Sequence, residues 1–139
     1  MSWNMYGAQR IAETDIADKF AAEETVAQFA ANLTGLDLVS FPRYSVVDRL
    51  LTLNGLPSSF LEIKTRTTAR GTFPTYRVST SKLTDLRALA SLTDVTVNLI
   101  VAWGCGSIGL ANVMHPEWVV NGDHAELNLD RFLPLRRPA

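Results

Sequence analysis

Asp48, Glu62 and Lys64 are charged residues set among apolar neighbours in one stretch near the middle of the sequence, YSVVDRLLTLNGLPSSFLEIKTR (residues 44–66). Asp48 follows a Val-Val pair, and Glu62 and Lys64 alternate with apolar residues further along. A hairpin that only filled a core would not carry such residues, because a buried charge without a partner is costly. We therefore expect these three side chains either to lie on a solvated face or to share a site.

The spacing of Glu62 and Lys64 determines that they point the same way. Residues two apart on a strand lie on one face of a sheet, so Leu61 and Ile63 point to the other face. The sequence therefore predicts a charged face and an apolar face on this strand.

Asp48 joins that charged face only in one register of the hairpin. Asn54-Gly55 is a strong hairpin signal, but a two-residue turn would pair Asp48 with residue 61 and send it to the apolar face. Pairing with residue 62 or 64 requires an odd loop of about three or five residues. Pro57 cannot donate to a strand ladder and favours the longer loop, so we predict the odd register.

A fourth acid lies on the preceding helix. The periodicity predicts one or two helices over residues 8–33, with a stripe of apolar side chains at helical spacing. Glu23 falls on that stripe, and Glu24 lies about 100° round the helix from it. An acid on the inward face of an apolar helix is the second indication of a site.

Together these residues can carry hydrolytic chemistry. Two carboxylates on one face repel each other unless a cation lies between them, and Mg²⁺ binds one or two carboxylates while keeping several waters. Lys64 could orient a water and stabilise developing phosphate charge. Glu23 could reach the same place and bind a water of the metal. The set is suited to metal-assisted hydrolysis of a phosphodiester.

The remaining elements must position these groups. After the helix we expect strands over 44–53 and 59–65, a polar loop over 67–75 and an extended piece at 76–78. A helix over 81–92, strands over 95–103 and 107–114, and a less regular tail follow. This α–β–β–α–β–β order predicts one mixed α/β or α+β domain, with a core of about 8–114 and an extension over 115–139.

Composition and charge narrow the classes of function. The net charge is −1, but residues 40–87 carry 8 basic and 3 acidic side chains, and the flanking segments are acidic, which favours an anionic ligand at this segment. No apolar run approaches a membrane span, and the N-terminus lacks a signal pattern, so we expect a cytoplasmic protein and no membrane partner. The single cysteine, Cys105, excludes an intrachain disulfide.

Residues 8–103 resemble the PD-(D/E)XK nuclease superfamily. VDRLLTLNGLPSSFLEIK resembles the hairpin of Holliday-junction resolvases, and AAEETVAQF resembles their first helix. The resemblance implies a restriction-endonuclease-like α-β-β-α-β core, with a mixed central sheet flanked by helices. One position departs from the pattern, because Val47 stands where the family name has a Pro.

The same resemblance implies roles for individual residues. Asp48, Glu62 and the backbone carbonyl of Ile63 would bind Mg²⁺ or Mn²⁺, with Glu23 acting through a water. Lys64 would be the catalytic lysine, and Glu24 is the alternative helix acid. DNA would be the partner, and the candidates for its contacts are Arg66, Arg70, Tyr76, Arg77, Ser81 and Lys82.

Within this reading an endonuclease or junction resolvase is favoured over an exonuclease. Small resolvases act as dimers, because two strands must be cut, and the apolar tail around residues 118–135 could supply a homodimer interface. The alternatives are an exonuclease of the same superfamily and a catalytically silent nucleic-acid-binding or protein-interaction module. A third function, an enzyme acting on a phosphorylated small molecule, is not supported, because the sequence has no phosphate-binding loop.

Other chemically capable side chains are interpreted as structural. His115 and His124 have no companions at metal-ligand spacing, and both are expected to be non-catalytic. Trp103 and Trp118 are expected in the core or at an interface. Cys105 lies between two glycines in a turn and is not expected to be a reactive thiol.

Overall fold

Two sheets and two helices make up the described part of the protein, which covers residues 22–42 and 45–136 of a computed structural model. The larger sheet has six strands in the order β1-β2-β3-β5-β6-β9, and β3 and β5 form its parallel pair. The smaller sheet has the order β4-β8-β7. The strands of the larger sheet are Asp37–Ser40, Arg49–Leu53, Leu56–Thr65, Thr96–Ala102, Ile108–Asn112 and Leu133–Pro134. Those of the smaller sheet are Thr75–Ser79, His124–Asn128 and Val119–Asn121.

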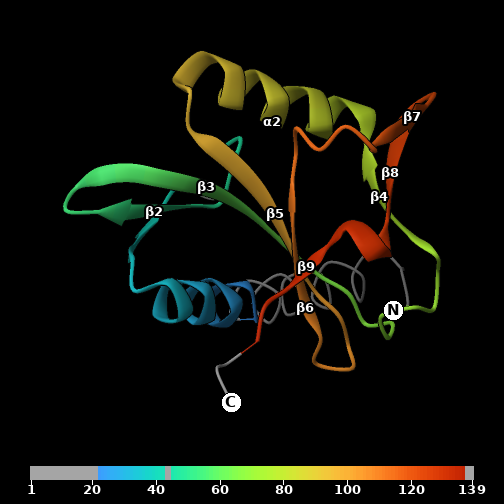
Figure 1. Cartoon of the computed structure of the whole chain (residues 1–139), viewed down its shortest axis with the longest axis horizontal. Coiled ribbons are helices and arrows are strands. Elements are labelled where there is room, and N and C mark those ends of the chain that lie inside the picture. Colours follow the sequence, from blue (N-terminus) through green and yellow to red (C-terminus); the bar gives the residue numbers. More distant parts are fainter. Residues whose placement is uncertain (1–21, 43–44, 137–139) are drawn as a thin grey trace, which may run out of the picture.

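The helices lie on opposite faces of the larger sheet (Figure 1). Helix α2 (Thr80–Thr93) packs through Leu83 and Leu86 against Leu99 of β5. The other helix, described over residues 22–34, packs against Leu61 and Ile63 of β3. Alternation along β3 therefore directs Glu62 and Lys64 toward the α2 side. The predicted mixed sheet flanked by helices is confirmed.

The hairpin reaches the predicted register by an unexpected route. Leu53 pairs with Leu56 across a two-residue turn, in which Asn54 and Gly55 both have positive φ values of 54° and 79°. The predicted longer loop is therefore wrong. A β-bulge restores the register, because Thr52 pairs with Pro57 whereas Leu51 pairs with Ser59, which leaves one extra residue in β3.

The bulge determines which way Asp48 faces. Beyond it Arg49 pairs with Leu61, so Asp48, the residue before β2, stands opposite Glu62. The predicted odd register is thus confirmed, although β2 begins at Arg49 rather than at residue 44, and β3 begins at Leu56 rather than at residue 59. Residues 43 and 44 lie outside the described part.

Helix α2 starts directly after β4, and this fixes the position of its first turn. Ser79 is the N-cap, and its side chain accepts a hydrogen bond from the Lys82 backbone N–H at 3.1 Å. The helix ends at Asp94, which has a φ of 56°. The predicted helix over 81–92 is confirmed within about one residue, a normal uncertainty for helix ends.

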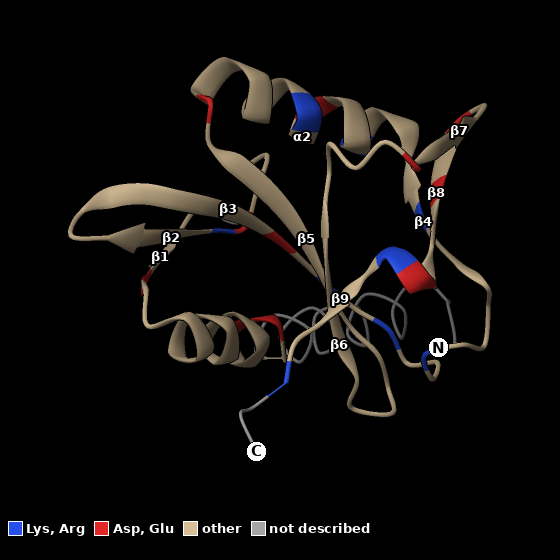
Figure 2. Ribbon diagram, in the orientation of Figure 1, with Lys and Arg blue, Asp and Glu red and all other residues tan. Residues whose placement is uncertain are grey.

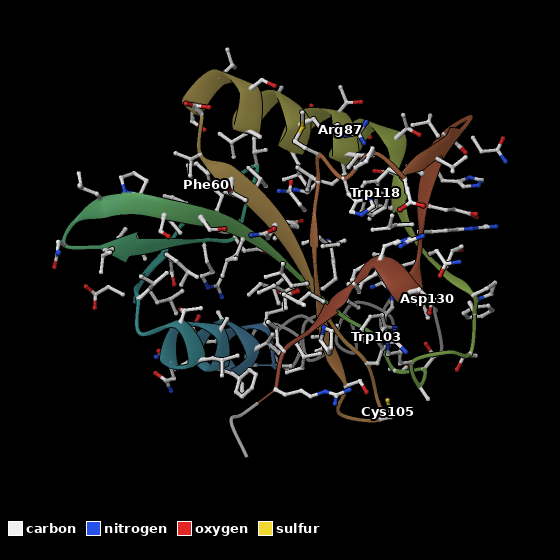
Figure 3. All side chains as sticks on the ribbon, in the orientation of Figure 1. Phe60, Arg87, Trp103, Cys105, Trp118 and Asp130 are labelled. Atoms are coloured by element: carbon white, nitrogen blue, oxygen red, sulfur yellow. The ribbon has the colours of Figure 1, made fainter. Side chains whose placement is uncertain are left out.

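The C-terminal segment is more regular than predicted. It supplies β7, β8, a 3₁₀ helix (Leu129–Arg131) and β9, so β8 joins the smaller sheet and β9 extends the larger one. Trp118 and Phe132 are buried in the same core as Leu83 of α2; Figure 3 shows Trp118 near α2. Much of the apolar surface expected at a dimer interface is therefore buried within the chain.

Strand β1 and the first helix also differ from the prediction. Strand β1 was not predicted. The predicted helix over 8–33 is seen from residue 22 to residue 34, and its part over 8–21 lies outside the described residues. Within the described ranges, neither helix has the length and apolar character needed to cross a membrane.

Candidate active site

Glu62 is at the centre of the candidate site. Its side chain is almost completely buried, with 3% exposed, although it belongs to an ionisable residue in the middle of β3. Oε2 lies 3.1 Å from Lys82 Nζ and 3.5 Å from Lys64 Nζ. Figure 2 shows an acidic segment of β3 running beside β5 in the interior of the sheet. Two ammonium groups from different elements thus meet one buried carboxylate.

Asp48 is fixed to the same strand by hydrogen bonds. Its Oδ2 accepts from the Ile63 backbone N–H at 2.8 Å, and its own N–H donates to the Leu61 carbonyl at 3.1 Å. Its carbonyl accepts from the Phe41 N–H at 3.1 Å. Both the backbone and the carboxylate of Asp48 are therefore held, so its side chain is presented in one orientation.

The two carboxylates affect each other. The pKa of Glu62 is raised, first by burial and then by the negative charge of Asp48, while Lys82 and Lys64 act in the opposite direction. The second oxygen of Glu62, Oε1, is buried and has no hydrogen-bond partner in the part of the chain that the structure describes. An unsatisfied buried carboxylate oxygen is costly, and a cation would satisfy it.

The donor set fits a hard divalent cation. No group of three or more His, Cys, Asp or Glu side chains with metal-binding geometry occurs among the described residues, so a site built from side chains alone is not present there. Mg²⁺ does not need one, because it commonly takes one or two carboxylates and fills its other positions with waters and substrate oxygens. Asp48 and Glu62, with the Ile63 carbonyl as a backbone ligand, would form such a set.

The predicted alternative helix acid, Glu24, is paired with Arg49. Its Oε2 accepts from Arg49 Nη2 at 2.8 Å and from Arg49 Nε at 3.2 Å. Arg49 is 2% exposed, and its Nη1 also donates to the Asp48 carbonyl at 3.0 Å. Glu24 therefore pairs on the helix side of the sheet, away from the Glu62 face. Glu23 is half-buried and is itself engaged with other groups.

A pocket of about 520 Å³ opens over the charged face. Glu62, Lys64 and Lys82 line it, so the carboxylate is reached from this side. His124, which was expected to be non-catalytic, also lines it and lies 3.3 Å from Asp123 through Nδ1. The pocket is also lined by three of the residues predicted to contact DNA, Arg66, Tyr76 and Arg77.

The predicted DNA-contacting residues are mostly engaged within the chain. Arg66 donates to the hydroxyl of Tyr76, and its guanidinium lies 4.7 Å from the centroid of that ring. Burial raises the pKa of Tyr76 to about 12, so its phenol stays protonated. Arg77 pairs with Glu126 at 2.5 Å. Arg66 and Arg77 nevertheless remain on the pocket wall.

Arg70 and Ser81 do not line the pocket over Glu62. Arg70 donates to the Leu129 carbonyl at 3.0 Å and lies 5.9 Å from the Trp103 ring centroid. Ser81 is exposed, with its hydroxyl 3.3 Å from that of Ser79. Lys82, the next residue, also donates to the Val46 carbonyl at 2.5 Å. Of these three, only Lys82 contacts the carboxylate.

Sequence reasoning missed Phe73 and the burial of Arg49. Phe73 lies in the loop before β4, is 63% exposed and lines a second pocket. Its aromatic type within a polar loop was the available signal. Arg49 follows Asp48 in an apolar strand, and the acid at Glu24 on the preceding helix was the corresponding signal.

The mixed sheet, its flanking helices and the Asp…Glu-x-Lys face together define a PD-(D/E)XK-type nuclease fold. Residues 9–124 match the family described as "Phage putative PDDEXK endonuclease". Because this match spans most of the chain, the protein belongs to that family. None of the curated proteins matches the sequence significantly.

A solved structure supports the same fold. Hjc from Archaeoglobus fulgidus, a Holliday junction resolvase of an archaeal hyperthermophile, is similar with a TM-score of 0.63 at 10% sequence identity. The similarity covers 83% of this chain and 88% of that one. At this identity the likeness concerns the arrangement of the elements.

Proposed function

We propose that this protein is a metal-dependent DNA endonuclease that hydrolyses phosphodiester bonds, with a preference for branched DNA like that of a junction resolvase. The observation that carries the proposal is the buried Glu62, which has one oxygen between two lysines and the other without a hydrogen-bond partner among the described residues, beside Asp48. Membership of an endonuclease family supports the class of reaction.

Each residue has a defined part in this proposal. Asp48, Glu62 and the Ile63 carbonyl would hold Mg²⁺ or Mn²⁺, with Glu23 acting through a water. When bound there, the cation would polarise the phosphate as a Lewis acid and lower the pKa of a water. Lys64, whose side chain is one-third exposed in the pocket, orients the attacking water and stabilises charge developing on the phosphate. Lys82 holds the Glu62 carboxylate in position.

We further propose that the enzyme acts as a homodimer in the cytoplasm of a bacterium or of a phage-infected cell. Cutting two strands of a junction requires two sites, which twofold symmetry supplies. Val119 and Val120 on edge strand β7 are 63% and 53% exposed and offer an apolar edge. A monomeric elution profile at micromolar concentration would contradict the dimer.

Metal binding can be tested separately from cleavage. Mg²⁺ that binds only the folded state raises the melting temperature, by an amount that grows with its concentration. We expect this rise for the wild type at pH 7 and its loss in Glu62→Gln and Asp48→Asn. Glu117→Gln, a surface carboxylate paired with Arg131, is the matched control and should respond like the wild type.

Cleavage is tested with labelled four-way junction, flap, linear duplex and single-stranded DNA. Each is incubated with Mg²⁺, with Mn²⁺ and with EDTA, using the wild type, Glu62→Ala and Lys64→Ala. We expect metal-dependent cutting that both substitutions reduce at least a hundredfold, with branched substrates cut best. Binding of DNA without cutting of any substrate would instead indicate a silent binding module.

A further inference from the structure

A second pocket, of about 500 Å³, adjoins the one over Glu62. Arg66, Tyr76 and Arg77 line both pockets, so the two spaces meet along these side chains. The second pocket contains neither Glu62 nor the two lysines. Its lining is aromatic, with Phe73 and Trp103 joining Tyr76.

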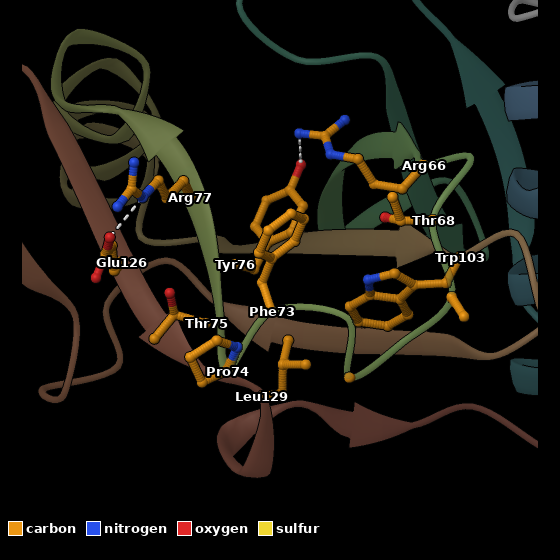
Figure 4. A pocket seen from close by; sticks show the side chains of 12 residues that line it. Arg66, Thr68, Phe73, Pro74, Thr75, Tyr76, Arg77, Trp103, Glu126 and Leu129 are labelled. Atoms are coloured by element: carbon orange, nitrogen blue, oxygen red, sulfur yellow. Dashed lines mark hydrogen bonds and ion pairs between the residues drawn. The ribbon is translucent and has the colours of Figure 1, made fainter.

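The aromatic rings differ in how far they are exposed. Tyr76 and Trp103 are 4% and 7% exposed and form a rigid base, since both contact the Phe132 ring edge-on at about 6 Å. Phe73 is 63% exposed. Figure 4 shows the side chains of Phe73 and Trp103 bordering the pocket, with Arg66 at one edge. The exposed ring of Phe73 is thus available to a ligand, and the buried rings of Tyr76 and Trp103 form the rigid base of the pocket.

The loop that carries Phe73 along one side of the pocket is held in place by close packing against the β5–β6 turn. Gly104 donates to the Thr68 carbonyl at 2.9 Å, and a Cβ at Gly104 would lie 2.2 Å from the Thr67 carbonyl oxygen. The loop that carries Phe73 therefore starts in direct contact with the turn that follows Trp103. The pocket is preformed, as ligand pockets usually are.

We propose that this pocket receives the base of an unpaired nucleotide next to the phosphodiester held at Glu62. This inference rests on the proposed nuclease function. A base offers a flat π face that stacks on an aromatic ring whatever its sequence. The positive Arg66 at the boundary lies where the connecting backbone would pass, while the negative charge of Glu126 is neutralised by Arg77. A polynucleotide can therefore occupy both pockets at once.

The pocket would also account for a preference for branched DNA. A base in a continuous duplex must leave its stack to enter, which costs free energy, whereas a base at a flap or junction is already unstacked or easily unstacked. Substrate choice would then follow from how easily one nucleotide can be extruded. A peptide side chain could fill the same space, and the experiment below distinguishes that occupant.

The test uses a flap substrate whose single strand carries 2-aminopurine at successive positions, bound without divalent metal. Stacking changes the fluorescence of this base. We expect a change at one position in the wild type, retained in Phe73→Tyr and lost in Phe73→Ala. Leu92→Ala removes an equally apolar side chain, 86% exposed on α2 and outside both pockets, and should behave like the wild type.

Affinity gives the second measurement. Phe73→Ala should weaken binding of the flap about five- to a hundredfold, the range for one stacked base. An abasic nucleotide at the responsive position should weaken wild-type binding by a similar factor and have little further effect on Phe73→Ala. Equal affinities for the intact and abasic strands in the wild type would overturn the proposal.

The outcomes separate the two proposals. If cutting requires metal and is lost in Glu62→Ala, but Phe73→Ala binds and cuts like the wild type, the nuclease stands and the base pocket is wrong. The exposed aromatic wall would then be a docking site for a protein. A Phe73-dependent fluorescence change without any cutting would keep the pocket and overturn the nuclease. Absence of both binding and cutting overturns both.

Discussion

The ammonium of Lys82 lies 3.1 Å from Glu62 Oε2 and joins the first turn of α2 to the central strand of the sheet. Its other acceptor is the Val46 carbonyl, two residues before Asp48. One side chain therefore connects three segments that meet at the candidate site. Lys64 Nζ is further from the same oxygen, at 3.5 Å.

This geometry predicts different effects for the two lysines. Lys82→Met removes a group that positions Glu62, and such substitutions typically cost 10–100-fold in metal affinity or activity. Lys64→Met removes the proposed catalytic ammonium and should cost about 10²–10³-fold in kcat. Single-turnover cleavage at several Mg²⁺ concentrations measures both. Higher Mg²⁺ should partly rescue Lys82→Met only.

The exposed Thr84, two residues further along α2, provides the control for this comparison. Thr84→Ala should retain the wild-type rate and Mg²⁺ dependence. If Lys82→Met also matched the wild type, the contact with Glu62 would have no role in the reaction.

The buried Glu62 predicts an activity–stability conflict. Because burial and Asp48 raise its pKa above the ordinary 4.5, folding favours the protonated form. The associated stability is present below pH 4.5 and is lost as the pH rises through the folded-state pKa. Glu62→Gln should therefore be more stable than the wild type at pH 7 without divalent metal, by about 1 kcal/mol.

Thermal unfolding of both proteins from pH 3.5 to pH 8 tests this. The advantage of Glu62→Gln should shrink as the pH falls through the folded-state pKa toward 4.5 and should change no further below 4.5, because the wild-type carboxyl is then neutral in both the folded and the unfolded state. Saturating Mg²⁺ should reduce the advantage at pH 7 by stabilising only the wild type. A constant difference across the pH range would show that Glu62 does not carry the burial cost.

Substitutions of the two adjacent helix acids, Glu23 and Glu24, should have different effects. Glu24→Gln weakens the charged hydrogen bonds to the buried Arg49 and should cost about 2 kcal/mol of stability, with the cleavage rate of the folded protein little changed. Glu23→Gln should instead lower the rate, as proposed for a residue acting through a water. Urea unfolding and cleavage rates measured on both variants decide the assignment; the reverse pattern would make Glu24 the functional acid.

Local periodicity was enough to predict that Glu62 and Lys64 share one face of the sheet. Glu62 and Lys64 lie on one face because side chains alternate along a strand, and Lys82 reaches them because Ser79 caps α2. The face of Asp48 was predicted correctly for a wrong reason. The register depends on the bulge at Ser58, and an extra residue in a strand leaves no distinctive signal in the sequence.

The unpredicted parts depend on long-range packing. Strands β1, β7 and β8 have only three to five residues and are stabilised by partners far away in the sequence, as when Tyr76 pairs with Leu127. The three residues of β7 are too few for a period-two pattern. The burial of Arg49 and the exposure of Phe73 follow from how distant segments meet, which local patterns do not encode.

The basic segment should contribute to the salt dependence of DNA binding. Arg66→Ala and Arg70→Ala should each weaken binding on all sequences, and each should reduce the slope of log K against log salt by about 1 if the side chain contacts a phosphate. Arg131→Ala, outside both pockets, provides the control. An unchanged slope in both variants would remove these residues from the DNA contact.

The close approach at Gly104 predicts a coupling between the β5–β6 turn and the aromatic pocket. A methyl group in Gly104→Ala would lie 2.2 Å from the backbone oxygen of Thr67, so the loop that leads to Phe73 must move. We expect a loss of about 1–3 kcal/mol in stability and loss of the 2-aminopurine response in the protein that remains folded. Gly106→Ala is the matched control in the same turn, since its Cβ meets nothing within 4 Å and the substitution strains only a φ of 90°. It should lower stability while keeping the response, and equal loss of the response in both variants would show that the pocket does not depend on this contact.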